Sequence, residues 1–476
     1  MIHKPITLKN ISFSLPHKIC FEDFSAQIGY GNRIAIIGQN GSGKSTLLNL
    51  LRGALEPTQG EIHLPEDVTL GYVPQVVEEF DTFSGGERLN KALTQALNLN
   101  PNVLLLDEPT NHLDRHNRKS LMRMLDRFPG TLIVVSHDVE LLRQSIHTLW
   151  HIDQGKVHVF SGSYDDYKRE SERKRAGIEK ELLTLNRQKK DMHQALMQEQ
   201  HRASQSQAKG RKLIEQRKWP TIQSATKFGR AASSFGAKKA ALGQKKQDLT
   251  DQLSALRLPE VIAPTFSLQS AERGDRSLLS IREGAVGYAG QPPLLTDITL
   301  SLHSRERIAV LGENGSGKTT LIKAILNDPS VIKTGEWFLP KSSDIGYLDQ
   351  HYGTLPHELS VLESVADLVP SWPHAEVRRH LNDFLFRKNE EITAPVSQLS
   401  GGEKARLSLA QIAAKTPHLL ILDELSNNLD LETREHVINV LKAYPGALLV
   451  ISHDEDFLEA IQVERYYDVE NWRRRA

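Results

Sequence analysis

The chain has 476 residues, 39% of them hydrophobic and 25% charged, and its 59 Lys and Arg balance its 59 Asp and Glu. This composition is ordinary for a soluble protein of two or three domains. The apolar runs, such as 103–106 and 419–422, are far below the ~20 residues that span a bilayer. A lone Cys20 excludes an internal disulfide and a multi-cysteine metal or iron–sulfur site. With no secretory signal recognisable at the start, we expect a cytoplasmic protein without a structural metal.

The charge is unevenly distributed along the chain. Residues 168–247 contain 21 Lys and Arg against 7 Asp and Glu, a local excess of 14 positive charges. Because the whole chain is formally neutral, the rest must carry the opposite excess. A basic segment poor in hydrophobic residues is therefore set between two acidic parts.

Those two parts are copies of one module. Gly-Gln-Asn-Gly-Ser-Gly-Lys-Ser at 38–45 recurs as Gly-Glu-Asn-Gly-Ser-Gly-Lys-Thr at 312–319, an offset of 274, and Gln75 recurs as Gln350, an offset of 275. Three later motifs recur at an offset of 316: Ser-Gly-Gly-Glu (84–87, 400–403), Asp-Glu (107–108, 423–424) and Ser-His-Asp (136–138, 452–454). The sequence indicates a duplication in which the first copy lacks 41 residues after its glutamine.

The elements of each copy follow the order of an α/β domain. Residues 33–37 and 307–311 are predicted to be short buried strands that lead into a glycine turn, with helices from Ser45 and Thr319. Four continuous apolar runs are typical of parallel strands covered on both faces: 103–106, 132–135, 419–422 and 448–451. Strand and helix therefore alternate in each half, which predicts an α/β sheet in each.

The glycine turns match the pattern Gly-x-x-x-x-Gly-Lys-[Ser/Thr] of a P-loop. Its backbone N–H groups and its lysine contact phosphates, and its Ser or Thr hydroxyl ligates Mg²⁺. A chance match is excluded by the second copy at the corresponding position. We assign MgATP binding to Gly38, Asn40, Gly41, Ser42, Gly43, Lys44, Ser45 and Thr46, and to Gly312, Asn314, Gly315, Ser316, Gly317, Lys318, Thr319 and Thr320.

Each module also has an apolar strand that ends in Asp-Glu. Asp107 and Asp423 are predicted to hold Mg²⁺ with Ser45 and Thr319. Glu108 and Glu424 are the candidate general bases. His137 and His453, after the next strand, are placed to contact the γ-phosphate. A strand-end carboxylate more often caps a loop and a lone histidine is more often structural, but the repeat favours function for all six: Asp107, Glu108, His137, Asp423, Glu424 and His453.

Ser84-Gly85-Gly86 and Ser400-Gly401-Gly402 are weak motifs in isolation, because Ser-Gly-Gly is a common turn. Helix-forming runs follow both, at 88–97 and 404–414. A serine and two small residues at a helix N-terminus form an anion site.

Taken in this order, the motifs resemble the nucleotide-binding domains of the ATP-binding cassette (ABC) superfamily, over residues 1–166 and 277–476. The resemblance implies two tandem ABC-type P-loop ATPase domains joined by a basic α-helical hairpin linker, 167–276. It implies that Gln75, Gln350 and the adenine-stacking Tyr288 contact nucleotide. It further implies composite sites within a monomer: 38–46 faces 400–402, and 312–320 faces 84–86.

Asp-Glu-Pro-Thr-Asn-His-Leu-Asp at 107–114 and the long charged linker resemble the ABC-F subfamily, whose members act on ribosomes rather than membranes. Two heptad-like stripes predict the hairpin: Ile178, Leu182, Leu185, Met192 and Leu196, then Leu242, Leu249, Leu253 and Leu256. A charge run can be only a solvated helix face, but basic residues interleaved with aromatics near the tip favour contacts to rRNA or tRNA. The candidates are Lys209, Arg211, Lys212, Arg217, Lys218, Trp219, Lys227, Phe228 and Arg230.

Three departures from the family pattern stand out. Only eight residues, 76–83, separate Gln75 from Ser84, too few for the usual helical subdomain or for an arm. This arm-less, shortened form resembles the antibiotic-resistance branch that protects ribosomes. Leu425 and Asn428 replace the Pro and His of the first copy, so the two sites can differ in their rate of ATP hydrolysis. Ser14 is the counterpart of Tyr288, which leaves open whether Phe13 stacks on adenine.

The leading hypothesis is an ATPase that binds the ribosome and inserts the linker tip near the tRNA-binding region. The main alternative is a fused ATPase subunit of a membrane transporter, which would contact its membrane partner through the helical subdomain that the first half nearly lacks. A DNA-repair or chromosome-type ATPase is the third, and those have zinc cysteines or far longer coiled coils.

Overall fold

The computed structural model describes residues 3–15, 18–75, 85–111, 113–215, 244–245, 262, 266, 277–349, 352–425 and 429–473. The chain divides into two compact units: Met1–Asp165 together with Val261–Ala476, and Asp166–Glu260. Both copies of the repeat belong to the first unit. Among the described residues, no helix has the length and apolar composition needed to cross a membrane.

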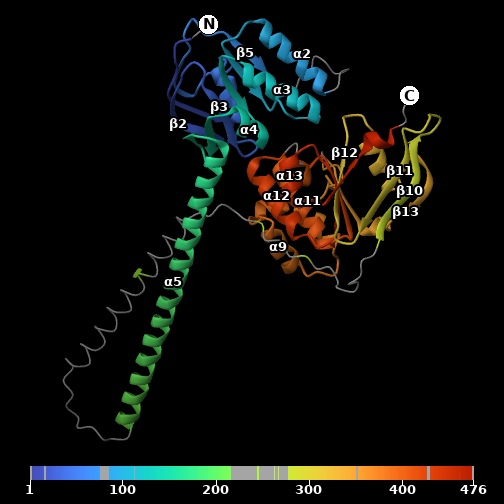
Figure 1. Ribbon diagram of the computed structural model, residues 1–476. Coiled ribbons are helices and arrows are strands. Elements are labelled where there is room, and N and C mark those ends of the chain that lie inside the picture. Colours follow the sequence, from blue (N-terminus) through green and yellow to red (C-terminus); the bar gives the residue numbers. More distant parts are fainter. Residues whose placement is uncertain are drawn as a thin grey trace. The chain divides into compact units, whose positions relative to one another are not determined.

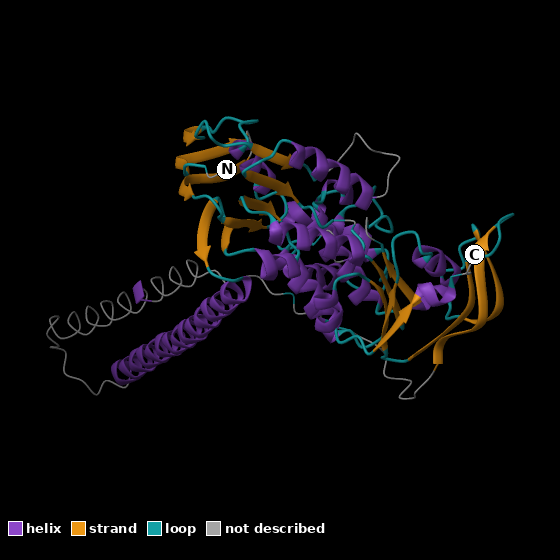
Figure 2. Ribbon diagram, turned by 45° about the horizontal axis from the view of Figure 1, so that its top comes forward, coloured by secondary structure: helices purple, strands orange, loops and turns teal. Residues whose placement is uncertain are grey.

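The first module is an α/β sandwich with a small antiparallel sheet, and its helices flank its strands (Figure 2). Its strands are β1 (Ile6–Leu15), β2 (Lys18–Ile28), β3 (Arg33–Gly38), β4 (Gln59–His63), β5 (Leu70–Val73), β6 (Val103–Asp107), β7 (Thr131–Val135), β8 (Thr148–Asp153) and β9 (Lys156–Ser161). Its helices are α1 (Lys44–Leu51), α2 (Gly85–Asn98), α3 (Arg115–Arg127) and α4 (Val139–Ser145). The sheet order β5-β6-β7-β3-β8-β9 is parallel except for β9, and β2-β1-β4 is antiparallel.

The second module repeats this topology. Its strands are β10 (Ser277–Tyr288), β11 (Leu295–His303), β12 (Arg307–Leu311), β13 (Val331–Phe338), β14 (Ile345–Leu348), β15 (Leu419–Asp423), β16 (Ala447–Ile451) and β17 (Arg465–Asp468). Its helices are α7 (Lys318–Ile325), α8 (Val361–Ala366), α9 (His374–Asp383), α10 (Asn389–Thr393), α11 (Gly401–Lys415), α12 (Leu431–Ala443) and α13 (Glu455–Ala460). The parallel order β14-β15-β16-β12-β17 matches β5-β6-β7-β3-β8 strand for strand. The predicted α/β fold with two copies is confirmed, and each predicted apolar run lies in a buried strand.

The two modules differ on one helix face. In the second, α8, α9 and α10 lie between β14 and α11, and Val361, Leu381 and Leu407 belong to one buried cluster. Leu407, Ala410 and Ala414 of α11 correspond, at the offset of 316, to the exposed Lys91, Thr94 and Asn98 of α2. The face that the second module covers with helices is therefore polar and solvent-exposed on α2.

The second unit contains all but the first two residues of one long helix, α5 (Tyr164–Glu215), which runs as a single green rod in Figure 1. Its 52 residues correspond to about 78 Å at the α-helical rise. Ile178, Leu182, Leu185 and Met192 of the predicted stripe are its less exposed residues, among neighbours that are mostly exposed. The second stripe (242, 249, 253 and 256) lies outside the described residues.

Candidate nucleotide sites

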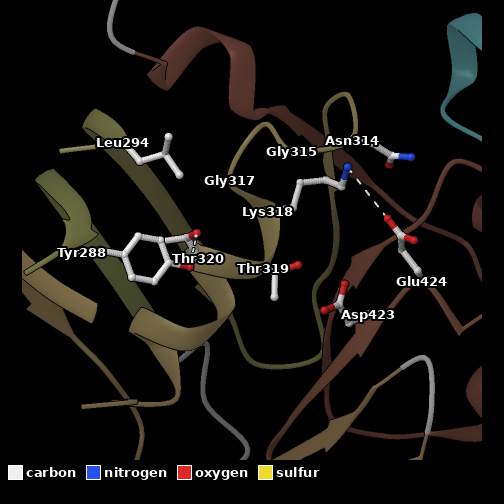
Figure 3. Close-up of a pocket in the computed structure, with 10 residues that line it drawn as sticks. All are labelled: Tyr288, Leu294, Asn314, Gly315, Gly317, Lys318, Thr319, Thr320, Asp423 and Glu424. Carbon is white, nitrogen blue, oxygen red and sulfur yellow. Dashed lines mark hydrogen bonds and ion pairs between the residues drawn. The ribbon is translucent and has the colours of Figure 1, made fainter. Parts of the chain in front are cut away.

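The second P-loop borders a cavity of about 490 Å³ (Figure 3). Tyr288 and Leu294 line one side of it, and Asp423 and Glu424 come from the end of β15. Tyr288 Oη lies 3.2 Å from Thr320 Oγ1, so the ring is tied to the helix that follows the loop. An aromatic ring, a glycine-rich loop and two carboxylates around one cavity suit a nucleotide with its phosphates.

Both P-loop lysines are buried and directed back onto their own loop. Lys318 Nζ donates to the carbonyl oxygens of Gly312 and Glu313, at 2.7 and 2.9 Å. Lys44 Nζ donates equivalently to Gly38 and Gln39, at 2.9 and 3.0 Å. Burial lowers the pKa of both ammonium groups. The two cations are thus held where phosphate oxygens would approach.

Glycine is required at two positions of each loop. Gly43 and Gly317, which precede α1 and α7, have φ of 105° and 108°, a region that residues with a side chain rarely adopt. A Cβ at Gly38 or Gly312 would press on the hydroxyl of the loop's own serine, at 2.9 and 2.7 Å. The loop can therefore hold its N–H groups inward only with glycine at these positions.

The aspartates that end β6 and β15 fit the predicted Mg²⁺. Asp107 is buried beside Ser45, and its Oδ1 has no hydrogen-bond partner among the described residues. In the second site, Asp423 Oδ2 accepts a hydrogen bond from Tyr347 Oη at 3.3 Å, and burial raises the pKa of Asp423 to about 6. Carboxylate and hydroxyl oxygens are the ligands that Mg²⁺ prefers, so the donor sets match the ion.

The following glutamates have a strained backbone in both modules. Glu108 and Glu424 have φ of 47° and 49°, and their N–H groups donate to Val135 and Ile451 at 2.9 Å. Non-glycine residues in this region cost free energy and cluster at functional sites. Because both modules have this strained backbone, we infer that it holds the carboxylate in a defined position.

A histidine accompanies each glutamate. His137 Nε2 lies 3.3 Å from Glu108 Oε1, and His453 Nε2 lies 4.0 Å from Glu424 Oε1. Burial lowers the histidine pKa values to about 3 and about 4, so both imidazoles are neutral at physiological pH. Burial raises the pKa of the Glu108 carboxyl to about 8, near the value that suits a general base at neutral pH.

Each site is influenced by an aspartate of the other module, through a hydrogen bond in the first site and through charge in the second. The Asn40 N–H donates to Asp430 Oδ2 at 2.9 Å, and Asp430 Oδ1 accepts from the Thr433 N–H at the start of α12. A Cβ added at Gly402 would lie 3.8 Å from that same Asp430 oxygen. In the opposite direction, burial lowers the pKa of Lys318, and the negative charge of Asp114 from the first module acts on this lysine and partly opposes that lowering. The Ser-Gly-Gly glycine, Asp430 and the first P-loop are thus neighbours.

Two buried ion pairs fix the histidine loops. Arg434 of α12 donates to both oxygens of Asp454, the residue after His453, at 3.0 Å. Arg118 of α3 donates to Asp138, the residue after His137, at 2.5 Å. Both aspartates also cap the helix that follows them. The arginines therefore link the helix after each Asp-Glu strand to the loop that carries the histidine.

Known proteins show the same organisation. The sequence model of the family described as ABC transporter matches residues 21–72 and 295–427. Ribosome protection protein VmlR of Bacillus subtilis is 30% identical over 487 residues, which cover 95% of this chain and 85% of VmlR. ABC transporter F family member 3 of Arabidopsis thaliana is 32% identical over 82% of this chain and 50% of its own length. The chain belongs to the ABC-F family of ATP-binding cassette ATPases.

Solved structures share the fold of this ABC-F chain. A structure of RNase-L Inhibitor has a TM-score of 0.57 over 95% of this chain and 86% of its own, at 18% identity. The complex of an archaeal ribosomal stalk protein with an archaeal ribosome recycling factor has a TM-score of 0.59, over 96% and 87%, also at 18% identity. The predicted family and the tandem arrangement of two ABC ATPase modules are confirmed.

The described structure contains most, but not all, of the predicted site residues. Both P-loops, the Asp-Glu pairs, both histidines, Tyr288 and Gly401–Gly402 are among the described residues, and Ser400 caps α11. Gln75 is exposed after β5. Phe13 lines a different cavity, beside Phe21 and Thr58, with no P-loop residue among those that line it. Ser84, Gln350 and Asn428 lie outside the described residues, as do Arg217, Lys218, Trp219, Lys227, Phe228 and Arg230.

Three further kinds of residue contribute to the sites beyond those predicted from the motifs. Asp114 and Asp430 recur at the offset of 316 as the last residue of the motif that begins with Asp-Glu, and this recurrence is the sequence signal for them. Tyr347 and Tyr72 correspond at the offset of 275, and this recurrence is the sequence signal that marks both tyrosines as candidate site residues. Tyr72 differs in having the Arg52 guanidinium over its ring at 4.3 Å. Arg118 and Arg434 recur too, but only the structure shows their aspartate partners.

Proposed function

We propose that this ABC-F protein is a Mg²⁺-dependent ATPase that acts on the ribosome, with ATP bound at two composite sites within one chain. The relative that carries the proposal is VmlR, named a ribosome protection protein, which aligns with 95% of this chain. The shortened connection between Gln75 and Ser84 favours the antibiotic-resistance branch, whose members protect the ribosome.

In the first site, Gly38–Thr46 would bind the phosphates together with Ser400–Gly402. Asp430 supports this pairing, because it joins the Asn40 N–H to the neighbourhood of Gly402. The second site would pair 312–320 with 84–86. Because each site needs both modules, nucleotide binding would favour the closed arrangement of the two, and hydrolysis would release it.

The chemistry is assigned to groups already in position. Lys44 and Lys318 would neutralise phosphate charge, and Ser45, Asp107, Thr319 and Asp423 would hold Mg²⁺, which screens the phosphates when bound. Glu108 and Glu424 would accept the proton of the attacking water. Neutral His137 and His453 can donate a hydrogen bond to the γ-phosphate without adding a charge.

The linker would contact rRNA or tRNA. Residues 168–247 hold the excess of 14 positive charges, and α5 presents the first part of it as a long exposed helix. Lys209, Arg211 and Lys212 lie near the end of α5, where cations would meet phosphates along an RNA backbone.

A sedimentation experiment tests the proposal. Glu108→Gln with Glu424→Gln removes both bases while ATP binding remains, so this variant should pellet with ribosomes in ATP and stay in the supernatant in ADP. Adding Lys44→Ala and Lys318→Ala should abolish the pelleting, because phosphate binding is lost. Adding K209E, R211E and K212E should weaken pelleting while a fluorescent ATP analogue still binds. A double glutamine variant that stays free of ribosomes in ATP refutes the ribosomal function, and stimulation of ATP turnover by membranes alone would favour a transporter subunit.

A further inference from the structure

The first module has a groove away from both nucleotide sites. Its volume is about 540 Å³, and it lies between the end of α2 and the second half of α3. Leu97, Met124, Phe128 and Pro129 give it an apolar lining, and Arg123 and Arg127 stand with them. None of these residues belongs to the P-loops, the Asp-Glu pairs or the histidine loops, so the ATPase function gives the groove no role.

The rim of the groove is cationic. Lys119, Arg123 and Arg127 follow one another at a spacing of four along α3, which places them in a row on one face, and all three are exposed. Asp126, the acidic residue within α3, is turned to other partners, because its carboxylate accepts hydrogen bonds from Ser145 and Gln144. An apolar groove under a row of cations selects for an occupant with apolar side chains and negative charge.

The second module shows what occupies the corresponding place. Tyr444 is the counterpart of Phe128 at the offset of 316, and each ring lies against a glycine two residues later, Gly130 or Gly446. The ring of Phe266 packs edge-on against Tyr444, with centroids 5.6 Å apart.

Ile262 is 2% exposed and belongs to the same buried cluster as Tyr444. The second module therefore covers its aromatic position with Phe266, and a second apolar side chain four residues earlier is buried in the same cluster.

The rims differ in charge. Asn439 and Ala443 of the second module stand where the first has Arg123 and Arg127. The end of α3 is also rigid, since Arg33 donates to the carbonyl oxygens of Leu125 and Phe128 at 2.9 Å. The first module thus has the same apolar aromatic position as the second, but two guanidinium groups stand beside it and the groove is open to solvent.

We propose that this groove docks an acidic segment of a partner protein. Apolar side chains of that segment would enter between Leu97 and Phe128, as Phe266 packs on Tyr444 with Ile262 buried in the same cluster. Its carboxylates would meet Arg123 and Arg127. A protein segment fits better than RNA, because Phe128 is 9% exposed and offers no free face on which a base could stack. The proposal does not depend on the ribosomal function.

A synthetic peptide tests it. The probe is fluorescein-labelled Asp-Glu-Val-Ile-Ala-Pro-Thr-Phe-Glu-Asp, which takes its centre from residues 261–266 and adds acidic flanks. Fluorescence anisotropy with the full chain should show saturable binding. Arg123→Glu with Arg127→Glu should weaken it about tenfold, the effect of two exposed charge contacts near the top of their usual range. A peptide with Ser in place of Ile and Phe should bind at least as weakly.

Matched variants keep the outcome interpretable. Arg379→Glu with Lys388→Glu reverses two exposed cations of the second module and should leave peptide affinity within about twofold. Arg123→Gln with Arg127→Gln is the milder form, and ATP binding by each variant reports its folding.

Three results would overturn the proposal. The first is a peptide affinity that does not change in R123E/R127E. The second is binding of a single-stranded oligouridine that requires these arginines, while the peptide fails to bind. The third is a dimer of the chain, seen by analytical ultracentrifugation, that the same substitutions dissociate.

Discussion

Arg434→Met is expected to destabilise the second module by about 3 kcal/mol. The Arg434 guanidinium donates to both carboxylate oxygens of Asp454, and the two side chains are 11% and 19% exposed. Removing one partner of a buried ion pair typically costs about 3–5 kcal/mol, because the other charge is left buried and unpaired. The lower end applies because Asp454 keeps the N–H of Phe457 as a donor.

The coupling between the two side chains separates this contact from a general loss of packing. Asp454→Asn removes the charge and keeps an acceptor for the cap, so the double variant R434M/D454N no longer buries a lone carboxylate. We expect R434M/D454N to be more stable than the sum of the single changes by about 2 kcal/mol. Urea unfolding followed by tryptophan fluorescence, to which Trp337, Trp372 and Trp472 of the second module contribute, measures each variant.

The functional readout is ATP turnover at the second site. Because Asp454 follows His453 and caps α13, R434M should also lower turnover under conditions where the protein remains folded. Arg118→Met with Asp138→Asn is the matched cycle in the first module. A coupling energy below about 0.5 kcal/mol in both modules would contradict the reasoning, since it would mean that the pairs are held without mutual stabilisation.

Three further predictions concern single side chains. Ser400→Ala and Ser360→Ala each remove a capping-box serine and should each lower the free energy of unfolding by about 1 kcal/mol. Only S400A should also lower ATP turnover, with S360A as the control. Tyr347→Phe removes the hydroxyl that donates to Asp423 and should raise the Mg²⁺ concentration for half-maximal turnover several-fold, whereas an unchanged Mg²⁺ titration would remove Tyr347 from the metal site. Burial lowers the pKa of His380, so the unfolded chain binds a proton at this histidine more readily than the folded chain does. The free energy of unfolding therefore falls as the pH drops below about 6.5, by at most about 1.4 kcal/mol per pH unit. His380→Gln should flatten this pH dependence in urea titrations between pH 7 and 5, and an equal pH dependence would refute the assignment.

The sequence by itself determined the local chemistry of both modules. Two P-loops, two Asp-Glu strand ends and two Ser-His-Asp loops recur at fixed offsets, and each depends on residues close together in the chain. Glycines with φ near 105° and continuous apolar strands produce the same loop wherever they occur. The predicted strands therefore agree with the observed ones to within about a residue at each end.

The tertiary structure decided which distant groups meet. Asn40 and Asp430 are 390 residues apart in the chain, and no periodicity or spacing links them. Arg434 and Asp454 are closer, but charged residues on a helix ordinarily face solvent, and only the structure shows that this pair is 11% and 19% exposed.

The treatment of the apolar faces was likewise settled in three dimensions. Ile262 and Phe266 lie within the predicted linker, 167–276, yet Phe266 packs on Tyr444 and Ile262 is buried with the second module. The sequence contains the matching Phe128, but composition alone does not show that one aromatic position is covered and the other borders an arginine-rimmed groove. Burial depends on what the rest of the chain brings to a surface, and that is a property of the fold rather than of any local segment.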